Sequence, residues 1–361
     1  MKLSLRFSAL VLFFFFPYLS QVQAQCTFSQ PNLVVFSQDE INQFAIDHPD
    51  CTELTTNIFI WEFTPGDITD LSPFSQLTRI NGNIEIRQNE ALQSLNGFHN
   101  LEYISGTLEV YENDVLEEIN LSKIDTIGEI NIYSSPELTN LNFDDLRVVD
   151  GNFTLTSSPK INSLQPFSNL ERVNGNMQIF GFPLLTSYEG FENLKVAETG
   201  IHLSNNDQIT DLTGLSGLDS VKNFQLTNHD ALTSLDGLSN TIYINAVRIS
   251  GNPLLTNCVI DPVCEALALG NSDGFFGISN NGGDQCFDND QVLQDCSGIY
   301  PVPIQVYADN NQNAQFDTGD DLLSGFRIEL VWNNTHAFSN KENACLFNLE
   351  EGQYQVRWVS E

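Results

Sequence analysis

The chain has 361 residues, enough for about two domains of ordinary size. Hydrophobic residues make up 41% of it and Phe alone contributes 26 side chains, so wholesale disorder is excluded. Acidic residues number 47 against 14 Lys and Arg, which gives a formal charge of -33. Because so acidic a surface repels phosphate groups, nucleic acid is a poor partner, and divalent cations or basic protein patches are favoured.

The first predicted element is a secretory signal peptide over residues 1–24. Basic residues precede the apolar run Phe7–Phe16, and small residues ending at Ala24 provide a cleavage site. The apolar run is shorter than the about 20 residues that a bilayer requires, and no later segment reaches that length, so no transmembrane segment is expected. A bacterial lipid anchor on Cys26 is the alternative, but Gln25 before it is neither small nor apolar.

All seven cysteines lie after the predicted cleavage site, in an oxidising compartment where disulfides are expected. Cys26 and Cys51 form an isolated pair near the N-terminus. Four more lie between Cys258 and Cys296 and allow three connectivities, which the sequence does not separate. Zinc is the alternative, but the gaps are wider than those of zinc clusters and no His lies among them. Cys345 is left over and is expected to be a small buried thiol rather than an intermolecular bridge.

A repeat of about 22 to 24 residues runs through residues 58–257, which is the period of leucine-rich repeats. The clearest copies begin at Asn81, Asn174 and Glu198, and the whole region holds about nine turns. Each copy carries a short alternating run, such as Ile84–Arg87, that predicts a strand with one buried side. Because one copy cannot bury its apolar side alone, the sequence predicts a mostly β fold, a right-handed leucine-rich-repeat solenoid with a parallel sheet.

A bend follows each predicted strand, and there a side-chain amide can satisfy the backbone groups of stacked turns. Several copies have Asn at this place: Asn89, Asn113, Asn206 and Asn252. Other copies replace it with Ser135, Ser158 or His229. The sequence therefore predicts an asparagine ladder that is interrupted in the middle.

The pattern resembles the receptor L-domain-like branch of leucine-rich repeats, found in growth-factor receptor ectodomains and in secreted bacterial proteins. The stretch Phe36–Leu54, within a cap expected over residues 25–57, is similar to the N-terminal cap of that group. The stretch Asn257–Cys286 resembles its C-terminal cap, expected here over residues 258–298. The resemblance implies three disulfides: Cys26 with Cys51, Cys258 with Cys286, and Cys264 with Cys296. Cross-linked caps cover the otherwise open ends of a solenoid.

The exposed side of the predicted sheet is a candidate binding surface. If Ile84 and Ile86 point inward, Glu85 and Arg87 point outward, and the same register applies to every copy. One outward row is then Phe59, Glu85, Glu109, Asn131, Thr154, Gln178, His202, Gln225 and Arg248. The neighbouring row is Trp61, Arg87, Tyr111, Tyr133, Thr156, Phe180, Ser204, Thr227 and Ser250.

From the second row we predict a recognition surface for a protein or a glycan. Its expected members are Trp61, Arg87, Tyr111, Tyr133 and Phe180. Exposed aromatic side chains beside Arg are typical of protein hot spots, and aromatic faces also stack on sugars. The alternative is that these aromatic residues only stabilise the sheet by pairing across strands.

A linker at residues 299–303 ends the repeat, and alternating runs within residues 304–361 predict a small antiparallel β-sandwich. Between its first two strands, Asp309–Asp320 has the ligand spacing of a calcium loop. The expected ligands are the side chains of Asp309, Asn311, Asn313, Asp317 and Asp320 and the backbone carbonyl of Gln315. Ala314 replaces the usual Gly and Asp320 the usual Glu, which lowers the expected affinity. An ordinary acidic surface turn is the alternative.

This segment resembles the calcium-binding B-type repeats of collagen-adhesin-like surface proteins, through its DxNxN loop and a GxYxV motif in its last strand. The resemblance implies one bound Ca²⁺ and the role of a stalk that holds another module away from the cell. The sequence stops abruptly at Glu361, so we expect a truncated domain, either because the chain is a fragment or because a C-terminal sorting segment is missing.

No enzyme is expected, because the sequence has no HExxH, GxSxG, P-loop or dinucleotide-binding motif and its five histidines are scattered. Glu85 and Glu109 lie on adjacent predicted strands, as the paired carboxylates of a glycosidase require, but on an open sheet without a cleft. We therefore expect a secreted or cell-surface binding or adhesion protein. The alternative is a structural envelope or spacer protein without a discrete ligand.

Overall fold

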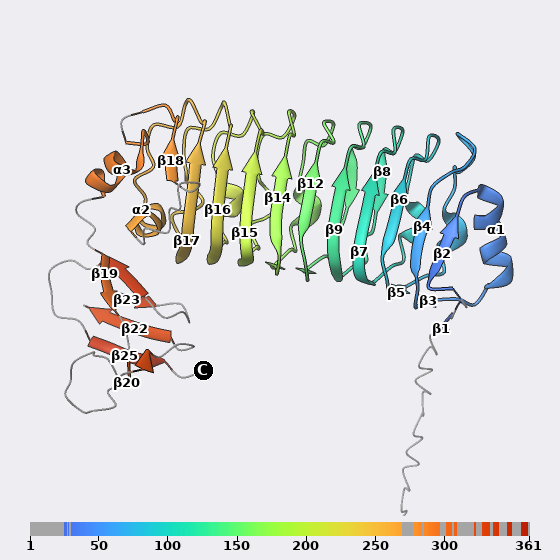
Figure 1. The fold of residues 1–361 in the computed structure, drawn as a ribbon, viewed down its shortest axis with the longest axis horizontal. Coiled ribbons are helices and arrows are strands. Elements are labelled where there is room, and N and C mark those ends of the chain that lie inside the picture. The colour runs from blue at the N-terminus through green and yellow to red at the C-terminus, as the bar shows by residue number, and fades with distance from the viewer. Residues whose placement is uncertain are drawn as a thin grey trace, which may run out of the picture.

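The computed structural model describes residues 25–26, 28, 30–268, 277–283 and 285–296, and beyond these the backbone of several short strands. A 16-stranded parallel sheet dominates this range (Figure 1). The predicted signal peptide, the calcium loop Asp309–Asp320 and the side chain of Cys345 lie outside the described residues. None of the described helices is long and apolar enough to cross a membrane.

The strands of the sheet lie in two rows that five longer strands join. One row contains β1 (Gln25–Cys26), β3 (Glu53–Leu54), β5 (Arg79–Ile80), β11 (Val148–Val149) and β13 (Arg172–Val173). The other contains β2 (Asn32–Val35), β4 (Asn57–Ile60), β6 (Ile84–Arg87), β12 (Phe153–Thr156), β14 (Asn176–Phe180) and β18 (Gly277–Ser279). The longer strands are β7 (Tyr103–Tyr111), β9 (Thr126–Tyr133), β15 (Val196–Ser204), β16 (Ser220–Thr227) and β17 (Tyr243–Ser250).

The other side of the solenoid has little regular structure. It holds the short parallel pair β8 (Glu118–Asn120) and β10 (Asn140–Asn142). It also holds the short 3-10 helices η1 (Ser72–Phe74), η2 (Asn96–Phe98), η3 (Gln165–Phe167) and η4 (Thr213–Leu215). Each copy of the repeat therefore contributes strands to one broad sheet and a short irregular segment to the opposite side.

The alternating side chains of the strands build the core. The inward residues Ile86, Val110, Ile132, Leu155 and Ile179 are register partners on successive strands, and each has 0% of its surface exposed. This single buried column is the arrangement that the alternation predicts. Because every copy covers its neighbour, the core is continuous along the solenoid.

From β6 to β18, a left-handed residue follows the outward-row strand in each turn of this sheet. The residues concerned are Gln88, Glu112, Ser134, Ser157, Gly181, Asn205, Asn228, Gly251 and Asn280, with φ between 51° and 79°. Most of them are not Gly, although such φ values are unfavourable for other side chains. The following residue, Asn89 in the first of these bends, is fully buried. The bend thus places a polar side chain inside the solenoid, where it must find partners.

The N-terminal end of the core is covered by α1 (Gln38–Asp47). The hydroxyl of Ser37 accepts a hydrogen bond from the Glu40 amide at 3.3 Å, which is the usual way for a helix to begin. Ile41 and Phe44 are buried, and the Phe44 ring lies 4.9 Å from that of Phe74. Further buried rings of the same column are Phe98, Phe143, Phe167 and Phe191.

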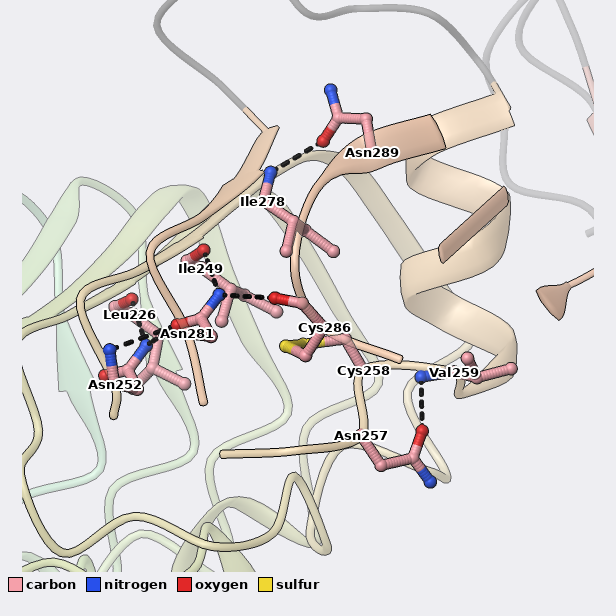
Figure 2. Close-up of a disulfide and its surroundings, with 10 residues drawn as sticks. All are labelled: Leu226, Ile249, Asn252, Asn257, Cys258, Val259, Ile278, Asn281, Cys286 and Asn289. Atoms are coloured by element: carbon pink, nitrogen blue, oxygen red, sulfur yellow. Dashed lines mark hydrogen bonds between the residues drawn. A yellow bond between two sulfur atoms is a disulfide. The ribbon is translucent and has the colours of Figure 1, made fainter. Parts of the chain in front are cut away.

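The C-terminal end is covered by α2 (Asp261–Ala268) and α3 (Asn289–Asp295). Disulfides join Cys258 to Cys286 (Figure 2), Cys264 to Cys296, and, at the other end, Cys26 to Cys51. These are the pairs that the resemblance implies. Asn281 Nδ2 donates to the Ile249 and Cys286 carbonyls at 2.9 and 3.2 Å, which ties the cap to the last turn.

After Cys296 the described backbone pairs only in antiparallel fashion, and its first strand, β19, already begins within the predicted linker at residues 299–303. β19 (Pro301–Ile304) pairs with β24 (Cys345–Asn348), and β20 (Tyr307–Ala308) with β21 (Asp321–Leu322). β22 (Arg327–Trp332) pairs with both β23 (Thr335–Phe338) and β25 (Gln355–Val359). The packing of these strands into a sandwich stays a prediction.

Candidate functional site

The outward side of the sheet carries the predicted binding residues. Glu85 pairs with Glu109, and Arg87 with Tyr111, in the register of β6 and β7. The same register continues through β9, β12 and β14 to β17, so the members of each outward row follow one another on adjacent strands. Trp61 follows β4 and lies beside Arg87. The rows derived from the alternation are therefore in the correct register.

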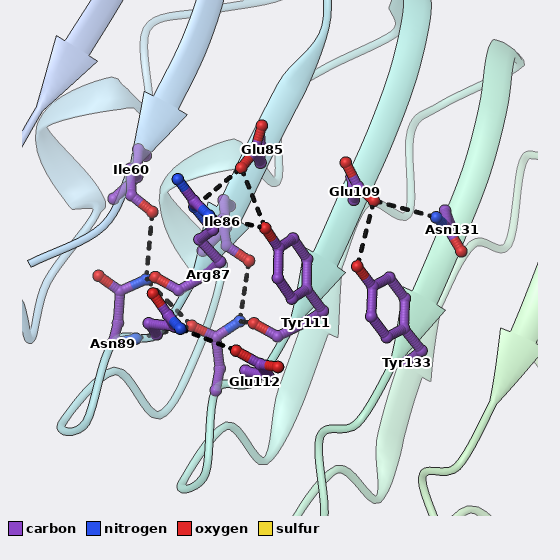
Figure 3. A network of polar contacts seen from close by, with 12 residues as sticks. Ile60, Glu85, Ile86, Arg87, Asn89, Glu109, Tyr111, Glu112, Asn131 and Tyr133 are labelled. Atoms are coloured by element: carbon purple, nitrogen blue, oxygen red, sulfur yellow. Dashed lines mark hydrogen bonds and ion pairs between the residues drawn. The ribbon is translucent and has the colours of Figure 1, made fainter.

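Four of the predicted binding residues form one continuous stack, which we call the aromatic ladder: Trp61, Arg87, Tyr111 and Tyr133. The Arg87 Cζ atom lies 4.6 Å from the centroid of the Trp61 ring and 6.0 Å from that of Tyr111. The Tyr111 and Tyr133 rings are 5° from parallel, with centroids 4.7 Å apart (Figure 3). Such contacts are worth about 0.5 to 1.5 kcal/mol each, so the ladder is a preordered unit.

Glu85, which belongs to the other outward row, contacts Arg87 and Tyr111 of the aromatic ladder and fixes their positions. The Arg87 Nε atom lies 2.9 Å from Glu85 Oε1, a close ion pair that lacks the alignment of a hydrogen bond. Arg87 Nη1 donates to the Tyr111 hydroxyl at 3.1 Å, and this hydroxyl donates to Glu85 Oε1 at 3.3 Å. Glu85, Arg87 and Tyr111 thus close a ring of polar contacts.

Glu109 holds the second half. Its Oε1 atom accepts from the Tyr133 hydroxyl at 3.3 Å and from Asn131 Nδ2 at 3.1 Å (Figure 3). Burial raises the pKa of Tyr133 to about 12, and the charge of Glu109 acts in the same direction. Burial also raises the pKa of Tyr111, against the hydrogen bond from Arg87. Both phenols are therefore protonated donors at neutral pH.

Phe180, the fifth predicted binding residue, does not join the ladder. Thr156 separates it from Tyr133 in the register, and Ser204 lies on its other side. Its side chain is 40% exposed. Ser204 and Thr227 were expected on the open face, but both are buried, with their hydroxyls hydrogen-bonded at 2.9 Å. The C-terminal half of this row therefore offers one isolated aromatic ring.

The other outward row changes character along the solenoid. Its C-terminal members Gln178, His202, Gln225 and Arg248 are register partners on β14 to β17. Burial lowers the pKa of His202, and the positive charge of Arg248 lowers it further. His202 is therefore neutral at physiological pH.

The buried asparagines behind the bends connect the turns. Asn113 Oδ1 accepts from the backbone N and the Nδ2 of Asn89, at 3.1 and 3.0 Å, and Asn113 Nδ2 donates to the Ile86 carbonyl at 2.9 Å (Figure 3). Ser135 and Ser158 instead donate to the carbonyl two positions earlier in their own copies, both at 3.4 Å. The ladder of amides is therefore interrupted in the middle, as the sequence predicts.

A buried polar contact in the second half was not expected from the sequence. The Tyr188 hydroxyl lies 2.7 Å from His229 Nε2 and accepts from Asn206 Nδ2 at 2.8 Å. His229 Nδ1 lies 3.0 Å from the Thr227 carbonyl, so this nitrogen carries the proton and Nε2, in the neutral ring, accepts from the Tyr188 hydroxyl. Burial lowers the pKa of His229 to about 4. The available signal was that Tyr188 stands where other copies have Leu, such as Leu95.

The described residues contain no group of three or more His, Cys, Asp or Glu side chains that could hold a metal ion. The expected calcium ligands, Asp309, Asn311, Asn313, Gln315, Asp317 and Asp320, lie outside those residues. Glu85 and Glu109, the adjacent carboxylates, are both engaged by tyrosine hydroxyls of the ladder. The site that the structure does describe is thus a surface of aromatic, guanidinium and carboxylate groups.

Residues 50–146 match the family model described as Receptor L domain. The matched segment runs from β3 to β10 and contains the whole aromatic ladder. Comparison with curated proteins gives no match. Receptor L domains are a ligand-binding, non-catalytic type of domain, so the match indicates a protein of the binding or receptor type. Together with the disulfides it indicates an extracellular or secreted location.

Proposed function

We propose that this chain is a secreted or cell-surface adhesion protein of bacterial type, which recognises a protein or a glycan on the open face of its solenoid. The aromatic ladder is the observation that carries the proposal. Trp, Tyr and Arg are the residue types that dominate binding hot spots. Because they are already held in one stack, they lose little conformational freedom when a partner docks. The match to receptor L domains over the same residues supports this proposal.

In the same proposal, residues 304–361 form a calcium-stabilised spacer that presents the solenoid. One Ca²⁺ is held by the side chains of Asp309, Asn311, Asn313, Asp317 and Asp320 and by the carbonyl of Gln315. The support for this part is the ligand spacing in the sequence and the resemblance to calcium-binding adhesin repeats.

A second candidate function is that of a structural envelope or spacer protein without a discrete ligand. The contacts within the aromatic ladder favour it, because the polar groups of Arg87, Tyr111 and Tyr133 already have partners inside the protein. Cross-strand pairs of this kind stabilise a sheet with or without a ligand.

The experiment that separates the two functions begins with a screen of the mature chain against glycans and surface proteins, with and without calcium. Trp61→Ala and Tyr133→Ala are then tested on whatever binds saturably. The matched control is Tyr103→Ala, which removes a similar stack, with Arg79 Cζ 3.9 Å from the ring, at the other end of β7. We expect the first two variants to bind at least about tenfold more weakly and the control to bind normally. Saturable binding that all three variants retain would place the ligand away from the aromatic ladder, and no saturable binding at all would favour the spacer.

A further inference from the structure

The aromatic ladder leaves few ring faces free. Arg87 lies over the Trp61 ring and also faces Tyr111, whose ring stacks on Tyr133. Sugars are held by stacking on the face of an aromatic ring. In the ladder these faces are turned toward one another, so a partner meets mainly ring edges and hydroxyl groups. Such edges suit the aliphatic stems of long side chains better than the flat side of a sugar.

Most of the carboxylates near the ladder have no cationic partner among the described residues. Glu85 is paired with Arg87, but among the described residues Glu109, Glu112 and Glu129 form no ion pair. The hydrogen-bond donors to Glu109 are the neutral Tyr133 and Asn131. Gln88, also neutral, donates to Glu112 at 2.9 Å (Figure 3). Glu109 and Glu112 therefore place negative charge beside the aromatic ladder, and Glu129 adds a third charge earlier on β9.

This charge is confined to one half of the face. Glu129 lies on β9 and is the register partner of Thr107 on β7, the strand that also carries Glu109 and Tyr111. From β12 to β17 the two outward rows contain no carboxylate, and they end with Arg248 on β17. A partner thus meets negative potential beside the aromatic ladder, whereas the two outward rows from β12 to β17 add none. A cationic partner is therefore expected to dock on the half of the face that carries the ladder.

We infer that the open face takes a protein segment that carries Lys or Arg side chains, rather than a glycan. The aliphatic stems of these side chains lie along the ring edges of the aromatic ladder, and their charged ends lie at Glu109, Glu112 and Glu129. This inference rests on the proposed function of the same face and specifies its partner.

The test uses the full chain and a phage-displayed library of random dodecapeptides as the probe. Peptides selected on the immobilised protein are synthesised, and their Kd is measured for the wild type and for Glu109→Gln/Glu129→Gln. Gln keeps a hydrogen-bond acceptor for Tyr133 while removing the charge. The matched control, Glu117→Gln/Glu189→Gln, removes the same net charge at exposed positions outside the two rows.

We expect the selected peptides to be enriched in Lys and Arg, and the first double variant to bind them about tenfold more weakly than the control does. Selection of no peptide, selection without basic enrichment, or equal loss in both double variants would overturn the inference. Binding of neutral oligosaccharides that depends on Phe180 or Trp61 would also overturn it but leave the proposed function standing. If Trp61→Ala and Tyr133→Ala leave all binding unchanged, the proposed function itself fails.

Discussion

At the scale of single residues, the buried contact of His229 with Tyr188 makes stability depend on pH. Burial lowers the pKa of His229 to about 4 from its ordinary 6.5. Above about pH 6.5 the ring is neutral in both the folded and the unfolded chain, and between that value and about pH 4 only the unfolded chain binds the proton. Unfolding therefore becomes easier as the pH falls through this window. The loss amounts to about 3 kcal/mol.

Chemical unfolding of the wild type and of His229→Asn at both ends of this window measures the effect. Asn occupies the same bend at Asn206 and Asn252, so we expect the variant to fold. The stability advantage of the wild type should shrink by about 3 kcal/mol from the neutral to the acidic end. Glu265, whose pKa burial raises to about 7, acts in the opposite direction, but it is common to both proteins and cancels. A constant advantage would show that His229 does not ionise on unfolding.

At the scale of elements, the buried asparagines should contribute more to the free energy of unfolding than the outward asparagines do. Asn113→Ala removes the acceptor for the Asn89 amide and the donor to the Ile86 carbonyl, both inside the solenoid. Buried groups left without partners cost about 1 to 3 kcal/mol each, so we expect a loss of about 3 to 5 kcal/mol in the free energy of unfolding. Asn131→Ala, the control on the outward face, should lose about 1 kcal/mol. Similar losses in denaturant titrations of the two variants would contradict this assignment.

The alternation and the period were sufficient to predict one strand in each copy, its register and the outward rows, but not the second row of short strands, which includes β3, β5 and β13. Both signals are local, because a two-residue alternation sets the face of a strand and a repeated length sets which residues meet. Burial depth was not predictable in this way, since it depends on how closely neighbouring copies cover a side chain, as with Ser204 and Thr227. The pairing of Tyr188 with His229 was missed for a related reason. It joins two positions at which single copies depart from the repeat.

At the scale of the whole molecule, the same reasoning divides the chain into a disulfide-capped solenoid and a C-terminal unit of antiparallel strands. The solenoid ends are closed by α1 and by the α2 and α3 cap, and the described residues contain no group of three or more His, Cys, Asp or Glu side chains that could hold a metal ion. If the proposed loop binds Ca²⁺, the ion stabilises only the C-terminal unit. A calcium concentration of about 100 times the Kd would then add about 2.7 kcal/mol to that unit.

Differential scanning calorimetry of the full chain, with calcium or with a chelator, tests this division. We expect calcium to raise the Tm of one transition and to leave that of the solenoid unchanged. Because Ala314 and Asp320 replace the usual Gly and Glu of the loop, the shift should require calcium well above the micromolar range. Asp309→Asn/Asp317→Asn removes two charged ligands and should abolish the shift. Identical melting curves for the wild type in calcium and in chelator would remove the calcium site and leave the binding face untouched.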